Sequence, residues 1–332
     1  MPHKPFRLLT GFIVGLLLVI TISLPHLMRS PPQRLVMMPF DWPGDLGFVL
    51  IHRLGLDKTH GIDLELPRLA TSDDMIRAFR NGVTDVLNFT LDVAVNLAAT
   101  EKDLRVIYAY NESAGADGMV ARADIKSIQD LRGRRVGAET GATSHYLLLA
   151  ILKKAGLTAN DITFVDVQTD EVERALTAKQ VDAVVTWEPN LTKALALPGM
   201  RLLTTSKDYP NLILNVLIVR QAALQAHPET YVHLIEAWNA MRQLCTADPT
   251  RCWKLLSSDQ NRPVNDLIAE AKGIHFLNLK DNRLLFTAEG GSGTVKEQLQ
   301  ATYSFLQANQ PKLPKFDPTF LYEPAIVLAA RE

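Results

Sequence analysis

Several features that mark common classes of protein are missing from this sequence. It has no excess of basic residues, because 35 Lys and Arg face 36 Asp and Glu. A general nucleic-acid binder needs a basic surface to release counterions from phosphate, so we expect no nucleic-acid partner. No internal repeat or low-complexity tract is present. The composition, 47% hydrophobic and 21% charged over 332 residues, is that of a globular protein with about two domains.

Familiar catalytic signatures are also absent. The sequence contains no Gly-x-Ser-x-Gly elbow and no His-Glu-x-x-His zinc helix. The glycine-rich run 290–294 lacks the lysine of a phosphate-binding loop and follows no clear strand. Ser144 and His145 are adjacent on an expected helix and so do not face each other. We therefore expect no enzymatic activity, no cofactor and no metal site.

Cysteine is scarce. Cys245 and Cys252 flank Asp248-Pro249, where one helix is expected to end and the next to begin. The two thiols could form a disulfide across this turn in an oxidising compartment. They could equally be two ordinary helix residues, because spacing alone does not fix side-chain geometry. Two thiols without clustered histidines make a zinc site improbable.

A long apolar run occurs only at the N-terminus. Lys4 and Arg7 precede the uncharged segment 8–25, which is rich in Leu, Ile and Val. Basic residues before an apolar core are typical of a secretory signal or a signal anchor, and suit a buried core helix less well. No small-x-small cleavage site precedes Arg29, and no cysteine follows for lipid attachment. We predict a periplasmic protein in which residues 1–33 are a signal or anchor with a spacer, with 8–25 as an inner-membrane tether.

Alternating strand and helix patterns fill the next part of the chain. Strands are expected at 34–39, 62–66, 85–89, 104–109, 135–137, 162–167 and 181–186, with helices between them. An extended segment, 212–220, is followed by helices at 228–244, 249–257, 264–272 and 294–309. This order predicts an α/β protein with mostly parallel sheets.

We further expect two lobes with a central cleft. The first lobe is discontinuous and comprises residues 34–120 and 218–332, and the second comprises residues 121–217. Two strands should cross between the lobes, near Val120 and near 216–219.

A series of short motifs carries a family resemblance. In chain order they are Trp42-Pro43-Gly44, Gly61-Ile62-Asp63-Leu64, Asn81 to Val86, Leu131 to Gly137, Asp182 to Pro189 and His227-Pro228-Glu229. Each is weak alone, but their order and spacing over roughly residues 34–310 resemble periplasmic substrate-binding proteins of ABC importers, of the nitrate/sulfonate/taurine and thiamine-pyrimidine type. The resemblance implies a type II periplasmic-binding-protein fold. It also implies a monomer that delivers a small-molecule ligand to an ABC transporter permease.

Candidate ligand-binding residues follow from the sheet pattern, because ligands of open parallel sheets bind beyond the carboxyl ends of the strands. The residues expected there are Asp41, Trp42, Asn88, Asp92, Ser113, Asp117, Thr140, Gly141, Thr143, Ser144, Trp187 and Glu188. The segment 140–144 opens a helix, which suits an anion, although it could be a plain capping turn. The two tryptophans could enclose a planar ligand or simply pack in the core.

The chemistry of this set points to a zwitterion. Four carboxylates, those of Asp41, Asp92, Asp117 and Glu188, suggest a cationic group on the ligand, although each alone could cap a helix. Together with the anion site they favour an aminosulfonate such as taurine, and a nitrogenous compound is the close alternative. Other functions consistent with the resemblance are a membrane-anchored ligand sensor and an enzyme of the same fold. A pyrimidine synthase is one such enzyme, but its cysteine-rich motif is absent.

Overall fold

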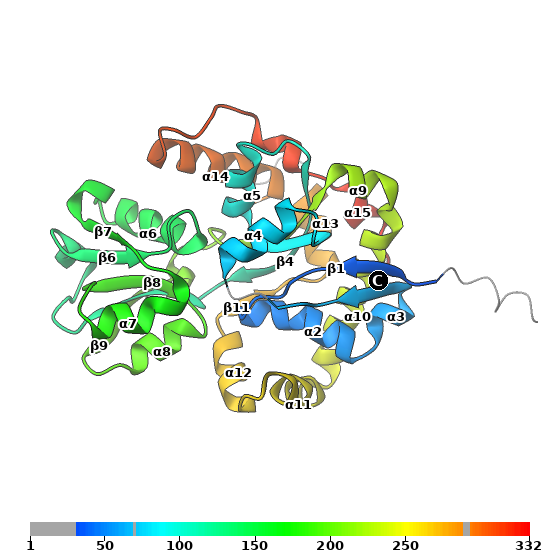
Figure 1. Cartoon of the computed structure of the whole chain (residues 1–332), viewed down its shortest axis with the longest axis horizontal. Helices are drawn as coiled ribbons and strands as arrows, with labels where there is room; N and C mark the ends of the chain where they lie inside the picture. The colour runs from blue at the N-terminus through cyan, green and yellow to red at the C-terminus, as the bar shows by residue number, and fades with distance from the viewer. Residues whose placement is uncertain (1–30, 69–70, 288–292) are drawn as a thin grey trace, which may run out of the picture.

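The computed structural model describes residues 31–68, 71–287 and 293–332. Figure 1 shows two α/β bodies side by side, one built on a five-stranded sheet and the other on a four-stranded sheet with a two-stranded sheet beside it. The expected membrane segment, 8–25, lies outside the described residues. Within the described ranges, no helix is long and apolar enough to cross a membrane.

The four-stranded sheet pairs strands that are far apart in the chain. In the order β11-β4-β10-β3 it contains β3 (Val86–Thr90), β4 (Leu104–Ser113), β10 (Leu214–Arg220) and β11 (Ile274–Phe276). β10 runs antiparallel to both of its neighbours, and β11 runs antiparallel to β4. The expectation of a mostly parallel sheet is wrong here, because the returning segment 212–220 enters between β3 and β4 in the opposite direction.

A small parallel sheet extends this body. It consists of β1 (Gln33–Val36) and β2 (Ile62–Glu65) and reaches β3 through a bridge between Met37 and Val86. The helices of this body include α2 (Leu46–Arg53), α3 (Leu56–Thr59), α4 (Ser72–Arg80), α5 (Leu91–Ala98), α9 (Gln221–Ala226), α10 (Pro228–Ala247), α11 (Pro249–Gln260), α12 (Val264–Ala271), α13 (Leu279–Thr287), α14 (Val295–Asn309) and α15 (Ala325–Ala329).

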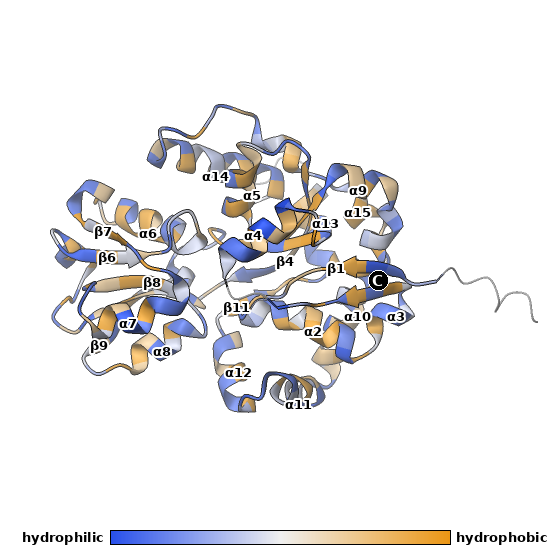
Figure 2. Ribbon diagram, viewed as in Figure 1, coloured by the Kyte–Doolittle hydropathy of each residue, from blue (hydrophilic) through white to orange (hydrophobic). Residues whose placement is uncertain are grey.

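Aromatic side chains fill the centre of this first body. Trp238 of α10 lies 4.7 Å, between ring centroids, from Phe48 of α2, and 5.6 Å from Tyr110 of β4. A Cβ on Gly47 would lie 2.4 Å from the Trp238 ring, so α2 and α10 approach closely because this residue has no side chain. Apolar residues concentrate along the strands and on the inner faces of the helices (Figure 2).

The five-stranded sheet is formed by one continuous stretch of chain. In the order β7-β6-β8-β5-β9 it contains β5 (Asp117–Arg122), β6 (Arg135–Ala138), β7 (Thr163–Asp166), β8 (Ala183–Trp187) and β9 (Met200–Thr205). The strands β6, β7 and β8 are parallel, whereas β5 is antiparallel to β8 and β9. The helices are α6 (Thr143–Lys154), α7 (Val172–Thr177) and α8 (Asn190–Ala196).

Helices cover both faces of this second sheet (Figure 1). Along β8, Ala183 and Val185 belong to the apolar cluster that contains the α6 side chains, whereas Val184 belongs to the cluster that contains those of α7 and α8. This alternation follows from the two-residue period of a strand. It explains why β8 is apolar at every position from 183 to 185.

The chain passes between the two sheets at residues 114–116 and again at 206–213, between β9 and β10. The expected crossing positions, Val120 and 216–219, lie inside β5 and β10. Apolar patterns continue over these strands, so the sequence does not mark the passage itself. The first passage contains Gly115, whose φ of +134° is a value that favours glycine.

Close backbone contacts hold the first passage in place. The amides of Ala114 and Ala116 donate to the carbonyl of Gly273, at 2.8 and 3.2 Å. A Cβ on Gly273 would lie 2.4 Å from the backbone nitrogen of Ala116, so this contact requires glycine.

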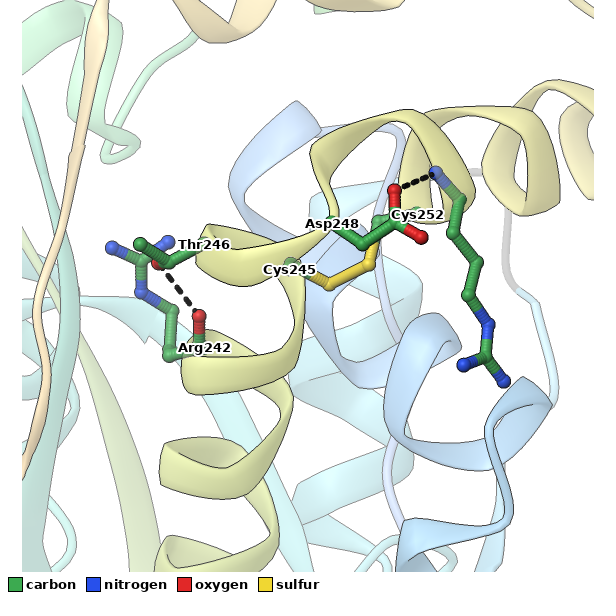
Figure 3. The surroundings of a disulfide bond; sticks show 6 residues. Arg242, Cys245, Thr246, Asp248 and Cys252 are labelled. Carbon is green, nitrogen blue, oxygen red and sulfur yellow. Dashed lines mark hydrogen bonds between the residues drawn. A yellow bond between two sulfur atoms is a disulfide. The ribbon is translucent and has the colours of Figure 1, made fainter.

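Of the two possibilities left open for the cysteines, the structure has the disulfide. Cys245 near the end of α10 and Cys252 in α11 are bonded, with their Cα atoms 5.6 Å apart (Figure 3). Asp248 separates the two helices and caps α11 by accepting a hydrogen bond of 3.0 Å from the amide of Arg251. The turn at Asp248-Pro249 therefore brings the two thiols together.

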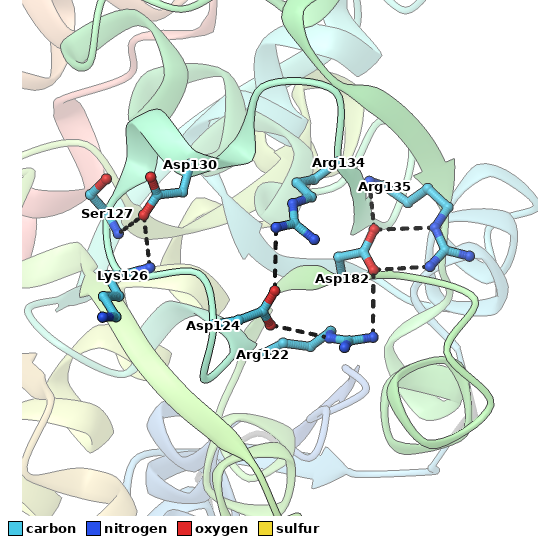
Figure 4. A network of polar contacts seen from close by, with 8 residues as sticks. All are labelled: Arg122, Asp124, Lys126, Ser127, Asp130, Arg134, Arg135 and Asp182. Carbon is cyan, nitrogen blue, oxygen red and sulfur yellow. Dashed lines mark hydrogen bonds and ion pairs between the residues drawn. The ribbon is translucent and has the colours of Figure 1, made fainter.

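A polar network lies at the opposite ends of β6 and β8 from Thr143 and Trp187 (Figure 4). Arg135 forms an ion pair of 2.9 Å with Asp182, and Arg134 one of 3.2 Å with Asp124. Arg134 and Arg135 therefore each have a carboxylate partner, and this cluster carries little net positive charge.

Candidate functional site

A pocket lies where the two bodies meet. Residues from both bodies and one residue of the second passage, Ile213, line it: Phe40, Trp42, Asp45, Asn88, Phe89, Thr90, Tyr110, Asp117, Thr143, Trp187, Ile213 and Asn215. Thr90 and Trp187 end β3 and β8, as expected for a site at the carboxyl ends of strands, whereas Asp117 and Asn215 lie at the amino ends of the antiparallel strands β5 and β10. The empty space between the lining side chains is about 410 Å³, a volume that includes space open to solvent.

Aromatic rings form much of the wall. Trp42 follows β1 and Trp187 ends β8, so the two indoles come from different sheets, and each is only 7% exposed. The ring of Phe40 lies 6.2 Å from that of Trp187, which joins the two bodies across the pocket. The indole N–H of Trp42 donates to the side-chain oxygen of Asn111 at 3.4 Å, and this hydrogen bond orients the ring.

Asp45 lines the pocket and is 1% exposed. Its carboxylate accepts hydrogen bonds from the amide of Phe40 (2.8 Å), the hydroxyl of Tyr110 (2.8 Å) and the amide nitrogen of Asn88 (2.5 Å). Burial raises the pKa of Asp45 to about 7, although these three bonds act in the opposite direction. Sequence reasoning missed Asp45, because an acidic residue just before a helix is usually a cap.

Two further buried carboxylates belong to Asp117 and Asp92. Asp117, at the start of β5, lines the pocket, and Asp92 lies in the first turn of α5. The pKa of Asp117 is raised to about 7, chiefly by burial and also by the charges of Asp92 and Glu188, whereas a hydrogen bond from Ser113 acts in the opposite direction. Burial likewise raises the pKa of Asp92 to about 6. None of the described residues that line the pocket is Lys, Arg or His.

The amide of Asn88 is oriented by Asp45. Because its nitrogen donates to that carboxylate, its oxygen Oδ1 is left as an acceptor, and within the described residues this oxygen has no hydrogen-bond partner. Asn88 is 2% exposed and lines the pocket. Oδ2 of Asp92 also lacks a partner there.

The expected anion-binding turn is only partly at the pocket. Thr143, at the start of α6, lines it, and its hydroxyl lies 2.7 Å from that of Thr90, which belongs to the other sheet. Thr140 and Gly141 are exposed and do not line the pocket. The Ser144 hydroxyl is buried and accepts a hydrogen bond of 3.0 Å from the amide of Glu139.

Five of the sequence-predicted residues come together in the pocket lining: Trp42, Asn88, Asp117, Thr143 and Trp187. The other seven lie outside it, namely Asp41, Asp92, Ser113, Thr140, Gly141, Ser144 and Glu188. Asp41 is exposed, and Glu188 accepts hydrogen bonds from Thr192 at the start of α8.

The residues that sequence reasoning missed include Tyr110, Phe40 and Asn215 in addition to Asp45. Tyr110 was not identified because the expected strand ended at 109, whereas β4 continues to Ser113. Asn215 lies beside Asn111 and Thr90 in the strand register. The signal that could have found it is a polar residue inside an otherwise apolar returning strand.

Known proteins show the same fold. The alkanesulfonate-binding protein SsuA from Xanthomonas axonopodis pv. citri, bound to MOPS, superposes with a TM-score of 0.69 at 20% identity, over 86% of this chain and 96% of that one. The desulfurization enzyme DSZB superposes with a TM-score of 0.62 at 15% identity, over 89% and 98%. The architecture is therefore an α/β fold of the periplasmic-binding-protein type. The similarity to DSZB shows that the same fold also occurs in an enzyme.

The sequence relatives match a smaller part of the chain than the solved structures do. The taurine-binding periplasmic protein of Escherichia coli K12 is 24% identical over 175 residues, which is 52% of this chain and 54% of the relative. The chain spans at most 61% of the length of the curated relatives that it matches. The family model described as NMT1/THI5 like matches residues 44–252. That match covers more than half of the sequence, and the chain therefore belongs to the NMT1/THI5-like family.

Proposed function

We propose that this protein is an extracytoplasmic solute-binding protein, which captures a small polar organic molecule and delivers it to an ABC importer. The observation that carries the proposal is a pocket lined from two sheets that are joined by two passages of chain. Buried aromatic and polar side chains in such a pocket are typical of a small-molecule site. The taurine-binding relative and the family membership support the role in import.

The arrangement suits a hinge mechanism. Phe40 and Trp187 meet from different bodies, as do Thr90 and Thr143. A ligand that contacts both bodies stabilises the closed form over the open form by its extra contacts. The passages at 114–116 and 206–213 are the segments that would absorb the rotation.

Two ligand classes fit this function. A taurine-like or sulfonate-like zwitterion is supported by the named relative and by the start of α6 beside Thr143. A nitrogenous compound is supported by the buried carboxylates. An enzyme acting through a cysteine is disfavoured, because both cysteines of the chain form the disulfide between α10 and α11.

The N-terminal tether is part of the proposal. Residues 8–25 would hold the protein at the inner membrane. After cell fractionation, we expect the full-length chain in the membrane fraction with its N-terminal residues present by mass spectrometry. A processed chain in the periplasmic extract would contradict the tether and leave the binding function untouched.

A thermal-shift screen tests the binding function. The panel contains taurine, alkanesulfonates, alkylamines and amidines. A ligand present at 100 times its Kd stabilises the folded state by about 2.7 kcal/mol. A stabilising compound recovered unchanged by mass spectrometry supports a binding protein. A compound that is consumed indicates an enzyme instead, and a folded protein that responds to nothing in the panel contradicts the proposal.

A further inference from the structure

Resting on the proposed binding function, we infer that the ligand is an organic cation with a planar or apolar body. Its charged nitrogen group lies between Asp117, Asn88 and Asp45, and its body packs against Trp42 and Trp187. A sulfonate group is not the part of the ligand that the pocket selects.

The first argument is the sign of the charge. Asp45 and Asp117 line the pocket, Asp92 is close enough to affect Asp117, and all three are at most 3% exposed. The described lining residues offer no cationic side chain to balance them. Ionised buried carboxylates without a cationic partner are costly, and their field attracts a cation and repels an anion. The counter-charge is therefore expected on the ligand.

Asn88 gives an independent argument. Asp45 fixes its amide so that the buried oxygen Oδ1 is available as an acceptor in the pocket lining and has no partner among the described residues. Nearly all buried polar atoms are hydrogen-bonded. An N–H group on the ligand would satisfy this oxygen, whereas the oxygens of a sulfonate would not, because they only accept hydrogen bonds.

The walls favour an organic cation. The pocket is lined by two indoles and two phenyl rings, and cations are attracted to the faces of such rings. Moreover, the described residues contain no group of three or more His, Cys, Asp or Glu side chains placed to hold a metal ion. An amine or amidine attached to a ring or short chain fits both the carboxylates and the aromatic walls.

Two helices, α5 and α6, begin near the pocket, and the N-terminus of α5 agrees with this assignment. The first turn of α5 already contains Asp92, whose own carboxylate faces the free amides there, since hydrogen bonds from the amides of Asp92 and Val93 lower its pKa. The first turn of α6 contains no acidic residue. A ligand that also carries an anionic group could place it there, so a zwitterion is compatible with the inference as long as its cation determines affinity.

Three probes with the same ring test the inference. Benzamidine is cationic, benzamide is neutral with N–H donors, and benzenesulfonate is anionic. Binding is measured by isothermal titration calorimetry with the full chain at pH 8, where the pocket carboxylates are ionised. We expect benzamidine to bind at least 10-fold more tightly than benzamide, and benzenesulfonate not to bind measurably. Tighter binding of benzenesulfonate than of benzamidine overturns the inference.

Variants locate the interaction. Asp117→Asn should weaken benzamidine at least 10-fold and change benzamide little, because only the charge is removed. Asn88→Ser is a second variant, which replaces the amide oxygen by a hydroxyl on a shorter side chain and should weaken both. Asp170→Asn, at an exposed carboxylate outside the pocket, is the matched control and should change neither. Unchanged benzamidine affinity in folded Asp117→Asn and Asn88→Ser proteins contradicts the assignment.

These experiments distinguish a wrong ligand charge from a wrong binding function. If benzenesulfonate or taurine binds in the pocket, as shown by loss in Trp187→Ala, and benzamidine does not, the inference is overturned and the binding function stands. If benzamidine binds but is hydrolysed, the binding function is overturned while the charge assignment stands.

Discussion

At the scale of single residues, the carboxylates of the pocket have a consequence for stability. The folded protein holds protons on Asp45, Asp92 and Asp117 up to a pH of about 6 to 7, whereas the unfolded chain releases them near pH 4. The unfolded state therefore binds fewer protons between these values, and the free energy of unfolding must fall as the pH rises through that window. The charges of Asp92 and Glu188, which face Asp117, raise its pKa, and the Tyr110 hydroxyl faces Asp45.

The measurement is urea unfolding of the ligand-free protein at pH 5 and pH 7. Asp117→Asn removes one of these groups, so the wild-type protein should lose roughly 2 kcal/mol more than the variant over this interval. The difference between the two proteins cancels the contribution of other titrating groups. An equal loss in both would show that Asp117 is already ionised in the folded state at pH 5.

Trp187 offers a second residue-scale prediction. Its indole is buried at the boundary of the two bodies, where truncation of tryptophan commonly removes 2 kcal/mol or more of binding energy. Trp187→Ala should therefore weaken the ligand found in the screen by about 10- to 100-fold in a calorimetric titration. Trp253→Ala, which removes a half-buried indole from α11, is the matched control and should leave the affinity unchanged.

Sequence reasoning identified site residues at or near the ends of expected strands. Trp42, Asn88, Asp117, Thr143 and Trp187 were found in this way. Asp45 could not be, because its role depends on donors that come from three separate places, namely Phe40, Asn88 and Tyr110. Whether these residues contact the ligand remains a prediction.

At the scale of secondary-structure elements, the disulfide links two helices over a short loop. In the loop-closure model a ring of this length stabilises the folded state by at most about 2.5 kcal/mol. The double variant Cys245→Ser, Cys252→Ser should unfold at a lower urea concentration. Its free energy of unfolding should be lower by at most about 2.5 kcal/mol. Adding a reductant should lower the stability of the wild-type protein similarly and leave the double variant unchanged. A reductant effect on the variant would point to another cause.

The elements with strong local patterns were predicted well. The helix that the segment 140–144 was expected to open corresponds to α6 at Thr143–Lys154, and the helix expected at 228–244 to α10 at Pro228–Ala247. The short strands β9 and β11 were not expected. The direction of β10 was also missed, because strand direction in a sheet depends on partners distant in the chain.

At the scale of the whole molecule, ligand binding should change the shape. If the two bodies close around the ligand, the radius of gyration measured by small-angle X-ray scattering should decrease on addition of saturating ligand. Trp187→Ala, at ligand concentrations that do not saturate it, should keep the radius of the free protein. An unchanged radius in a saturated wild-type protein would contradict a hinge mechanism and leave the pocket assignment in place.

The insertion of β10 between β3 and β4 also dictates an order of assembly. Residues 117–205 form their sheet from one continuous stretch, whereas β3 and β4 lack their shared partner until Arg220 has been synthesised. Asn215 pairs with Thr90, more than a hundred residues earlier, and such distant pairings form slowly. The half of the molecule that is made first is therefore completed last. Until then the open edges of β3 and β4 can pair with other chains, and a chaperone that covers them would protect the nascent protein from aggregation.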